Sequence, residues 1–494
     1  MSSIEKSMKK QFSQYRNELA ILAGVAFFLF FFLADPLSLA FKARLVLAVA
    51  ILMISWWVLE ALPLSVVALV PIVLFPLFNI SPVKEVTKSY ADSMIFLFMG
   101  GFFIALAIEK WKLHQRIALS IIHLTGTNGD RIILGFIMST GFLSFWLSNT
   151  ATTMMMFPIA LSVIQVMNEH SKPGEHMKNF STVLMLCIAY ASNFAFGTII
   201  ATPPNVAYVG YIQEKFNYTI GFADWMMVFM PLSIIMMGCL YFVTVKWLFP
   251  NHIRHSEEGK NHISQTLKQL GPLSVAEKRV LAIFIGTVLL WITKDILNSL
   301  QSMVKLDDTM IAMTGGLLMF MVTSGKINDE GRAERILHWK DTTRMSWGIL
   351  ILFGGGIALA KALEEAQLMN QLGTFIASYA TENLFVMILL ITTISVFLSE
   401  VMSNVAQVIV MAPVISSVAI ALHMDPLQLG LPMTIGATCA GMLPMGTPPN
   451  AIVFSSGYIK LNDMLKTGFV MNLISIILVS LFCYFLQPMI MKLT

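Results

Sequence analysis

The chain is a succession of long apolar runs separated by short polar breaks. Several runs, taken with their flanking residues, reach the roughly 17–25 residues that an α-helix needs to cross a hydrocarbon core about 30 Å thick. Reading the runs between the breaks predicts eleven membrane crossings. These lie near residues 19–34, 41–58, 62–79, 94–109, 182–213, 226–249, 280–298, 309–323, 346–362, 430–458 and 466–489.

Two further apolar stretches have a different pattern, in which a polar centre is followed by a proline. They cover about residues 132–167 and 385–422. We expect each to be a re-entrant hairpin that enters and leaves the membrane on one side. The sequence therefore predicts an all-α polytopic membrane protein with about eleven transmembrane helices and two re-entrant hairpins.

The two halves of the chain repeat the same polar strings about 250 residues apart. The first string contains Ser-Asn, and a proline follows nine residues after the Asn, at Pro158 and at Pro413. The second string is Thr-Pro-Pro-Asn inside a long apolar segment. Under the eleven-crossing count the halves begin on opposite faces, so we predict two inverted repeats. The matched strings are Leu143–Ala151 with Leu398–Ala406, and Ala201–Asn205 with Gly446–Asn450.

The Thr-Pro-Pro-Asn strings should break their helices. In hydrocarbon an unsatisfied backbone group costs several kcal/mol, so Pro-Pro is tolerated there only where the freed carbonyls find partners. We therefore predict broken helices at about 182–213 and 430–458, with their breaks near the bilayer midplane. Carbonyls of one half-helix can coordinate a cation, and N–H groups of the other can bind an anion.

The Ser-Asn strings supply oxygen ligands. In each, two serines lie four residues apart on one helical face, directly before the Asn. Hydroxyl and amide oxygens suit sodium, and an Asn amide can face sodium with its oxygen and a carboxylate with its NH₂ group. None of the four strings contains Lys, Arg or His, so sodium ions would have to balance a buried dianion. The residues are Ser144, Ser148 and Asn149, and Ser399, Ser403 and Asn404.

Composition agrees with a membrane protein, because only 12% of the 494 residues are charged, against about 25% in soluble proteins. Lys6, Lys9 and Lys10 precede the first crossing, which places an N-terminal segment, residues 1–18, in the cytoplasm. Residues 250–279 are also basic and are expected to form a cytoplasmic loop. We expect a multi-pass protein of a bacterial inner membrane. No basic run with interleaved aromatics predicts a nucleic-acid partner.

Other function classes find less support in the sequence. It contains no His-Glu-x-x-His and no Gly-x-Ser-x-Gly, so we do not expect an enzyme. It also contains no phosphate-binding loop, which argues against primary transport. Composition does not separate a channel from a transporter, but broken helices in inverted repeats favour alternating access. A transporter of arsenite or protons is a closer alternative, which a requirement for a carboxylate substrate would decide against.

Glu400 follows Ser399 and has no acidic counterpart in the first repeat, where Phe145 stands. An acidic residue inside a membrane is a functional candidate. A structural hydrogen bond to the hairpin backbone is the alternative. The sequence leaves these two roles open.

The paired motifs resemble those of the divalent anion:sodium symporter family, which carries di- and tricarboxylates or sulfate. The resemblance covers about residues 19–492 and rests on Ser148–Thr150, Ser403–Val405 and the two Thr-Pro-Pro-Asn breaks. It implies sodium-coupled symport of a C4-dicarboxylate such as succinate, malate or fumarate. It also implies a homodimer and an elevator-type movement across the lipid bilayer.

The resemblance further implies the binding residues. Val405 stands where Thr is expected, and the lost hydroxyl leaves citrate or sulfate open as substrates. Sodium-independent anion exchange is another alternative, although the chain keeps the sodium-binding oxygens. Carried over by position, the first Na⁺ site would use Ser144, Ser148, Asn149 and Ala201, and the second Ser399, Ser403, Asn404 and Gly446. The substrate would meet Asn149, Thr150, Thr202, Asn404, Val405, Thr447 and Pro448.

The same resemblance divides the chain into a scaffold and a mobile transport region. Residues 19–109 and 280–362 would form the scaffold. Residues 110–249 and 363–494 would form the transport region, each part with one hairpin and one broken helix.

Overall fold

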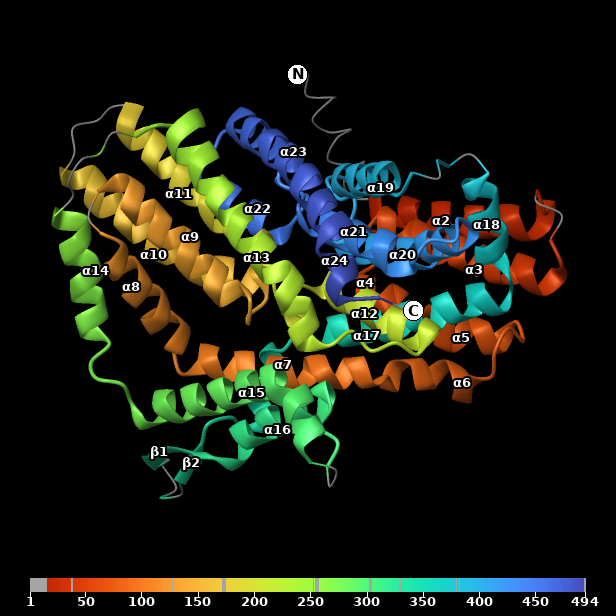
Figure 1. The fold of residues 1–494 in the computed structure, drawn as a ribbon, viewed down its shortest axis with the longest axis horizontal. Coiled ribbons are helices and arrows are strands. Elements are labelled where there is room, and N and C mark those ends of the chain that lie inside the picture. Colours follow the sequence, from red (N-terminus) through yellow and green to blue (C-terminus); the bar gives the residue numbers. More distant parts are fainter. Residues whose placement is uncertain are drawn as a thin grey trace.

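The fold is almost entirely helical (Figure 1). The predicted N-terminal segment falls almost wholly outside the described residues, as do Lys6, Lys9 and Lys10. The computed structural model describes residues 16–36, 39–126, 128–170, 175–251, 253, 257–301, 304–327, 331, 333–378, 380–381 and 383–492.

Nine helical segments in the described part of the chain are long and apolar enough to cross a membrane. Seven of them coincide with predicted crossings, and two coincide with the second arms of the predicted hairpins, which confirms an all-α polytopic membrane protein. The nine segments are Asn17–Ala34, Phe41–Val58, Val83–Lys110, Asn149–Glu169, Phe222–Leu248, Val275–Leu300, Trp347–Glu365, Asn404–Ala421 and Leu461–Ile490.

The first half of the chain contains one helical hairpin, α9 and α10, and one broken helix, α11 and α12. Residues 145–148 separate the arms of the hairpin, and residues 194–202 separate the half-helices. In order, the elements are α2 (Arg16–Ala34), α3 (Phe41–Val58), α4 (Leu64–Val67), α5 (Val70–Leu77), α6 (Val83–Lys88), η1 (Ser89–Ala91), α7 (Ser93–Lys110), α8 (Leu113–Thr125), α9 (Gly129–Ser144), α10 (Asn149–His170), α11 (Glu175–Asn193), η2 (Ile199–Ala201), α12 (Pro203–Phe216), α13 (Phe222–Tyr241) and η3 (Phe242–Leu248).

The second half repeats this order, with the hairpin α19 and α20 and the broken helix α21 and α22. Residues 399–403 and 439–447 are the corresponding interruptions. The elements are α14 (Glu257–Gln269), α15 (Val275–Leu300), α16 (Asp308–Met321), β1 (Thr323–Ile327), β2 (Ala333–Arg335), η4 (Trp339–Arg344), α17 (Trp347–Glu365), α18 (Leu368–Ala377), α19 (Leu384–Leu398), α20 (Asn404–Ala421), α21 (Pro426–Thr438), α22 (Pro448–Phe454), α23 (Leu461–Phe485) and α24 (Gln487–Ile490).

The repeat extends to backbone details that no motif marks. Lys112 and Gln367 lie 255 residues apart, and both have left-handed backbone angles, with φ of 56° and 57°, at the start of α8 and of α18. At the same spacing, a Cβ atom on Gly100 would lie 2.4 Å from the Ala312 backbone, and one on Gly355 would lie 2.3 Å from the Ala68 carbonyl oxygen. Both glycines therefore allow a helix to pack backbone against backbone, α7 on α16 and α17 on α4.

The two halves interlock in space. The short helix α22 of the second half packs on α10 and α11 of the first, while α12 of the first half packs on α20 of the second (Figure 1). Each broken helix thus lies against the hairpin of the other half. A site built at one break is consequently shared by both repeats.

Several features differ from the sequence prediction, among them the helices α6, α8 and α18, which lie outside all predicted spans. The predicted loop at 250–279 contains the helix α14, which packs on α8 and α10. The predicted crossing at 62–79 is divided into α4 and α5, because Pro71 stands at the start of α5 and has no N–H to continue the preceding helix. A two-stranded antiparallel ribbon, β1 with β2, connects α16 to η4, where the sequence predicted helices alone.

Buried apolar side chains form two clusters. The smaller cluster joins α3, α4 and α5 to α17, with Val46, Trp57 and Phe75 near its centre. The larger cluster runs through both hairpins and both broken helices. Ala207 and Val405 are half-buried and pack against both clusters, so the boundary between the clusters passes beside the start of α20.

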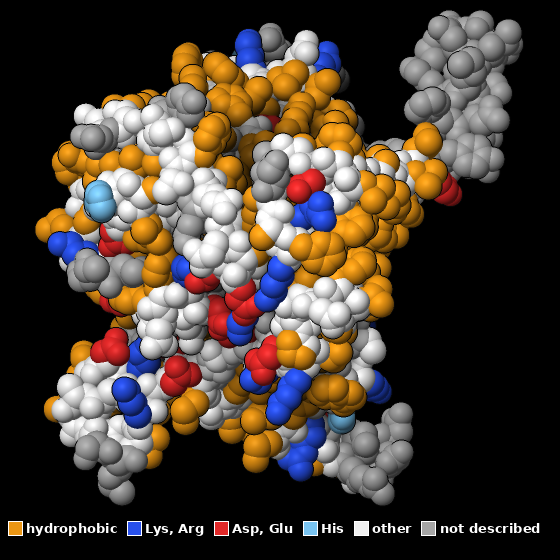
Figure 2. Space-filling model, turned by 90° about the vertical axis from the view of Figure 1, so that its right-hand side faces the viewer, with side chains coloured by type: hydrophobic (Ala, Val, Ile, Leu, Met, Phe, Trp, Pro, Cys, Tyr) orange, Lys and Arg blue, Asp and Glu red, His pale blue; other side chains and the backbone are white. Residues whose placement is uncertain are grey.

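The end of the molecule formed by α2, α3 and α5 is largely apolar on its surface. Figure 2 views this end and shows hydrophobic side chains over a wide area, with acidic and basic side chains gathered near the middle of the face. Exposed apolar residues here include Leu22, Phe30, Leu33, Val73 and Leu77. Such a surface fits lipid or a second protein subunit.

Candidate ion and substrate site

Both Thr-Pro-Pro-Asn strings interrupt helices as predicted. Pro203 is the first residue of α12, and Pro448 is the first residue of α22. Proline fits this position because its missing N–H would have no intrahelical acceptor there. The preceding threonines, Thr202 and Thr447, are 2% and 1% exposed, so both breaks lie deep in the protein.

The two asparagines of these strings make the same hydrogen bond. The side-chain amide of Asn205 donates to the carbonyl of Thr198 at 3.1 Å, and that of Asn450 donates to the carbonyl of Leu443, also at 3.1 Å. Each amide thus binds a carbonyl seven residues earlier, inside the interruption. The asparagines close the two breaks into loops.

The tip of the first hairpin is held by its own polar string. The Ser148 hydroxyl accepts a hydrogen bond from the Ala151 N–H at 3.3 Å, and the Asn149 side-chain oxygen accepts one from the Thr150 N–H at 2.9 Å. The Thr198 hydroxyl then ties the tip to the first break by donating to the Phe145 carbonyl. Ser148, Asn149 and Thr150 remain half-buried and accessible.

A residue that sequence reasoning missed links this tip to the second break. Asn193, the last residue of α11, accepts a hydrogen bond from the Asn149 amide at 3.4 Å. Its own amide donates to the Thr447 hydroxyl at 3.1 Å and to the Asn450 side-chain oxygen at 3.2 Å. Three residues of the predicted strings therefore meet at one side chain outside them.

Glu400 joins the second hairpin to the second break. One carboxylate oxygen accepts from the N–H groups of Gly441 and Met442, at 2.8 and 2.9 Å, and from the Asn472 amide at 2.8 Å. The other oxygen accepts from the Leu443 N–H at 3.1 Å. The carboxylate is thus bound by the backbone of the break, and not by the hairpin backbone that the sequence suggested as its structural partner.

Equivalent hydroxyls of the two repeats differ in their partners. The Ser399 hydroxyl donates to the Ala437 carbonyl at 2.5 Å, whereas the fully buried Ser144 hydroxyl has no hydrogen-bond partner among the described residues. Likewise Thr447 is hydrogen-bonded, while the buried Thr202 hydroxyl is unpaired within the described part of the chain. Unpaired buried oxygens in the first half are the kind of group that a sodium ion or an anion would satisfy.

The remaining predicted site residues lie at the start of α20 and at the two breaks. Asn404 and Val405 open α20 and are half-buried, and Pro448 is exposed. Ala201 is buried at the end of η2. A Cβ atom on the buried Gly446 would lie 3.2 Å from a Glu400 carboxylate oxygen, so a negative charge stands next to this stretch of backbone.

A cavity reaches the first hairpin tip from the side of η4. It is lined by Leu147, Ser148 and Ala151 of the first half and by Arg344 and Ser346 of the second. Ser148 is thus the predicted site residue that lines a space between the two halves.

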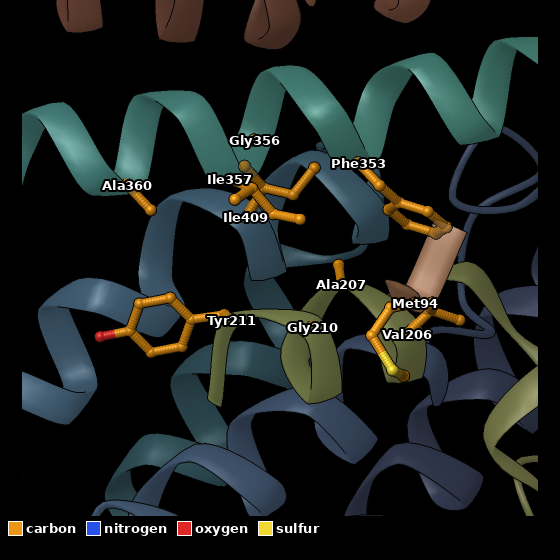
Figure 3. Close-up of a pocket in the computed structure, with 10 residues that line it drawn as sticks. All are labelled: Met94, Val206, Ala207, Gly210, Tyr211, Phe353, Gly356, Ile357, Ala360 and Ile409. Carbon is orange, nitrogen blue, oxygen red and sulfur yellow. The ribbon is translucent and has the colours of Figure 1, made fainter. Parts of the chain in front are cut away.

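A second cavity lies between α12 and α17 and contains none of the predicted site residues (Figure 3). Its walls are apolar, and several of the facing residues are small: Ala207 and Gly210 on α12, and Gly356 and Ala360 on α17. Acidic and basic residues of the same two helices line the adjoining space. This cavity lies where the first broken helix packs on a helix of the predicted scaffold.

Comparison with known proteins identifies the family. Residues 14–493 match the family described as the sodium:sulfate symporter transmembrane region. The chain is 38% identical over 474 residues to the sodium-dependent dicarboxylate transporter SdcS of Staphylococcus saprophyticus, covering 95% of this chain and 91% of that protein. It is 37% identical to the SdcS of Staphylococcus aureus strain USA300 over 98% of this chain and 93% of that one.

The fold is also similar to a solved transporter structure. The crystal structure of the Alcanivorax borkumensis YdaH transporter superimposes with a TM-score of 0.57 at 13% identity, covering 81% of this chain and 86% of that one. At this identity the likeness concerns the fold alone. The match over nearly the whole sequence shows that the chain belongs to the sodium:sulfate symporter family.

Proposed function

We propose that the protein is a secondary active transporter, and not an enzyme, which couples sodium to the transport of a small divalent anion. A C4-dicarboxylate such as succinate, malate or fumarate is the substrate we assign. Relatives named sodium-dependent dicarboxylate transporters, at 37–38% identity over nearly the whole chain, support both the ion and the substrate class. The observation that carries the proposal is the meeting of Asn149 with Thr447 through Asn193, together with the buried Ser144 and Thr202 hydroxyls, which are unpaired among the described residues.

Sodium would be bound once in each half. The unpaired hydroxyl of Ser144 supports the first site, because a buried oxygen without a hydrogen bond can turn a lone pair to a cation. The carboxylate of Glu400 supports the second, because its charge lies beside Gly446. The full ligand sets are Ser144, Ser148, Asn149 and Ala201, and Ser399, Ser403, Asn404 and Gly446.

The anion would lie between the sodium sites. Amide and hydroxyl groups donate to carboxylate oxygens, and the two sodium ions supply the positive charge that the polar strings lack. Val405 adds an apolar contact in place of the hydroxyl of Thr150. The proposed substrate contacts are Asn149, Thr150, Thr202, Asn404, Val405, Thr447 and Pro448.

Transport would proceed by an elevator-type movement of the two hairpins and broken helices against the scaffold. The cavity between α12 and α17 supports this division, because it lies along the proposed boundary and has small apolar residues on both facing helices (Figure 3). The proposed scaffold is residues 19–109 and 280–362, and the proposed transport region is residues 110–249 and 363–494.

We also propose a homodimer in a bacterial inner membrane, with the N-terminus in the cytoplasm. The apolar face formed by α2, α3 and α5 supports a second copy at that end of the scaffold (Figure 2). Chemical cross-linking in native membranes tests the dimer. The orientation is tested with a cysteine placed before α2. In intact cells a membrane-impermeant thiol reagent should leave this cysteine unlabelled.

The function is tested by uptake of labelled succinate into proteoliposomes with inward sodium, with inward potassium, or with internal unlabelled succinate. We expect concentrative uptake with sodium alone, and its loss in Asn149→Ala. Uptake that requires internal succinate would show that the protein is an exchanger and not a symporter. Uptake of citrate or sulfate, but not of succinate, would show that the substrate is not a C4-dicarboxylate.

A further inference from the structure

We propose that Asn193 is a positioning residue that couples the two halves of the transport site by orienting the Thr447 hydroxyl. The inference rests on the proposed function, since it concerns the site at which the anion binds. Asn193 is 1% exposed, so its side chain is removed from solvent and acts through its hydrogen bonds. Its three partners belong to the first hairpin and to the second break.

The orientation of the Asn193 amide is determined by its neighbours. The Asn149 oxygen accepts from the Thr150 N–H, so the Asn149 NH₂ group must face Asn193. The Asn450 NH₂ group donates to the Leu443 carbonyl, so the Asn450 oxygen must face Asn193. Asn193 therefore meets the first half with its oxygen and the second half with its NH₂ group, and each of its donors meets an acceptor.

This arrangement determines what the Thr447 hydroxyl can do. A hydroxyl has one hydrogen to donate and two lone pairs to accept with. The Thr447 oxygen accepts from the Asn193 NH₂ group at 3.1 Å and from the Asn450 N–H at 3.4 Å, which uses both lone pairs. Its hydrogen is then the group left to donate, as an anion requires of its site.

Repeat symmetry does not explain the bridge. The residue of the second broken helix that corresponds to Asn193, at the same distance from Thr-Pro-Pro-Asn, is Thr438. The Thr438 hydroxyl donates to the Ile435 carbonyl of its own helix at 2.7 Å. Thr438 is equally buried, so it provides a matched control for a substitution at Asn193.

The test uses the full-length protein in proteoliposomes and compares Asn193→Ala, Asn193→Asp and Thr438→Ala. For Asn193→Ala we expect the succinate KM to rise by about fivefold to tenfold, which corresponds to the loss of one to two hydrogen bonds. The sodium concentration for half-maximal uptake should rise as well. Thr438→Ala should stay within about twofold of the parent, because it removes no contact between the halves.

Asn193→Asp separates positioning from folding. The new carboxylate keeps the acceptor for Asn149 but loses both donors to the second half. We therefore expect its succinate KM to rise at least as much as that of Asn193→Ala, although the side chain keeps its size.

A double-mutant cycle with Thr447→Val identifies the group through which Asn193 acts. If Asn193 orients the Thr447 hydroxyl, Asn193→Ala adds little to the KM of Thr447→Val. Unchanged KM values for succinate and sodium in Asn193→Ala, or fully additive effects in the double variant, would overturn the proposal.

A separate readout distinguishes failure of the proposed function. If the parent does not take up succinate, the sodium-induced rise in Tm of the purified protein replaces uptake as the measurement. Asn193→Ala should then halve that rise or more at equal sodium, while Thr438→Ala retains it. Equal sodium-induced shifts in the parent and Asn193→Ala would overturn the coupling whatever the substrate is.

Discussion

Asn205 and Asn450 donate the same side-chain hydrogen bond in the two halves of the molecule, each to the main-chain carbonyl seven residues earlier and each at 3.1 Å. The carbonyls belong to the loops that interrupt the two broken helices. Because hydrocarbon offers these loops no water, their carbonyls depend on such internal donors. The motif asparagine therefore builds the break, a role that precedes any contact with a ligand.

Replacing these asparagines should destabilise the protein unequally. Asn205→Ala takes one donor from the Thr198 carbonyl, which keeps the Ala201 N–H at 3.3 Å, so we expect a loss of about 0.5–1.5 kcal/mol. Asn450→Ala likewise leaves the Leu443 carbonyl with the Gly446 N–H alone, and it also removes the oxygen that the buried Asn193 amide donates to, so we expect the larger loss. The Tm of both purified variants measures this. A Tm for Asn450→Ala equal to or above that of Asn205→Ala would contradict the additional bond.

Glu400 should be intolerant even of Gln. Its two oxygens accept four hydrogen bonds, and the Gln amide would turn an NH₂ group toward backbone N–H groups of the second break. Hydrogen bonds to a charged group are worth about 1.5–3 kcal/mol each, so we expect Glu400→Gln to lower the Tm and to raise the sodium concentration for half-maximal uptake. Glu365→Gln, at an exposed position, is the control. Full sodium activation in Glu400→Gln would disprove the requirement for the charge.

Sodium removal should distinguish the two serines. Replacing sodium by potassium lowers the Tm of the parent, because an ion that binds only the folded state stabilises it. Ser144→Ala should reduce this difference and leave the sodium-free Tm nearly unchanged, since the Ser144 hydroxyl has no partner among the described residues. Ser399→Ala should lower the Tm even without sodium, because it leaves the Ala437 carbonyl unpaired. A sodium-free Tm lowered equally by both would refute this asymmetry.

The ion pair between Lys110 and Asp341 should make stability depend on pH in acid. Burial alone would raise the pKa of Asp341, but the Lys110 ammonium at 2.7 Å and the His338 N–H at 2.8 Å lower this pKa below its ordinary value of 3.8. A lowered pKa contributes stability that is present above about pH 4 and is lost as the pH falls further. Asp341→Asn should remove this part of the acid dependence. Thermal unfolding between pH 3 and 6 measures this effect. The Tm of the parent should exceed that of Asp341→Asn only above about pH 4.

The breaks and the hairpins were predictable because their signals are local. Pro203 and Pro448 each begin a helix because proline has no N–H to continue a preceding one. The Ser-Asn strings lie where the two arms of each hairpin meet. The helix α14 was missed inside a polar loop, although Ile263 and Leu267, four residues apart, carried its signal. Its apolar face was too short to stand out beside membrane segments.

The contacts that assemble the site were not predictable from local pattern. Asn193 bonds to residues 254 and 257 positions away, and Thr438 stands at its position in the second half, so the repeat does not mark it. Glu400 was noticed, but three of its partners lie in a loop 41–43 residues on and the fourth, Asn472, lies in α23, and the packing of α19 against α21 and α23 brings them near. Repetition identified the strings, whereas the residues that join them lie where the repeats differ.

Two ion pairs beside the cavity between α12 and α17 provide a test of relative movement. Lys215 of α12 pairs with Glu364 of α17, and Lys361 of α17 lies 3.9 Å from Glu214 of α12. Each helix therefore contributes the basic residue to one pair and the acidic residue to the other. If α12 moves against α17 during transport, both pairs must break. Partly exposed pairs are worth about 0.2–1 kcal/mol, so their loss should change the uptake rate by up to about fivefold and leave the succinate KM nearly constant.

The charge reversal Lys215→Glu combined with Glu364→Lys restores the attraction and should return the rate toward that of the parent, whereas either single reversal places like charges together. Raising the ionic strength with choline chloride at constant sodium should reduce the difference between the single reversals and the parent, because salt screens exposed charges. Rates that follow neither the reversal nor the salt would mean that these helices keep their contact throughout the cycle, and the boundary between scaffold and transport region would then have to lie on the other side of α12.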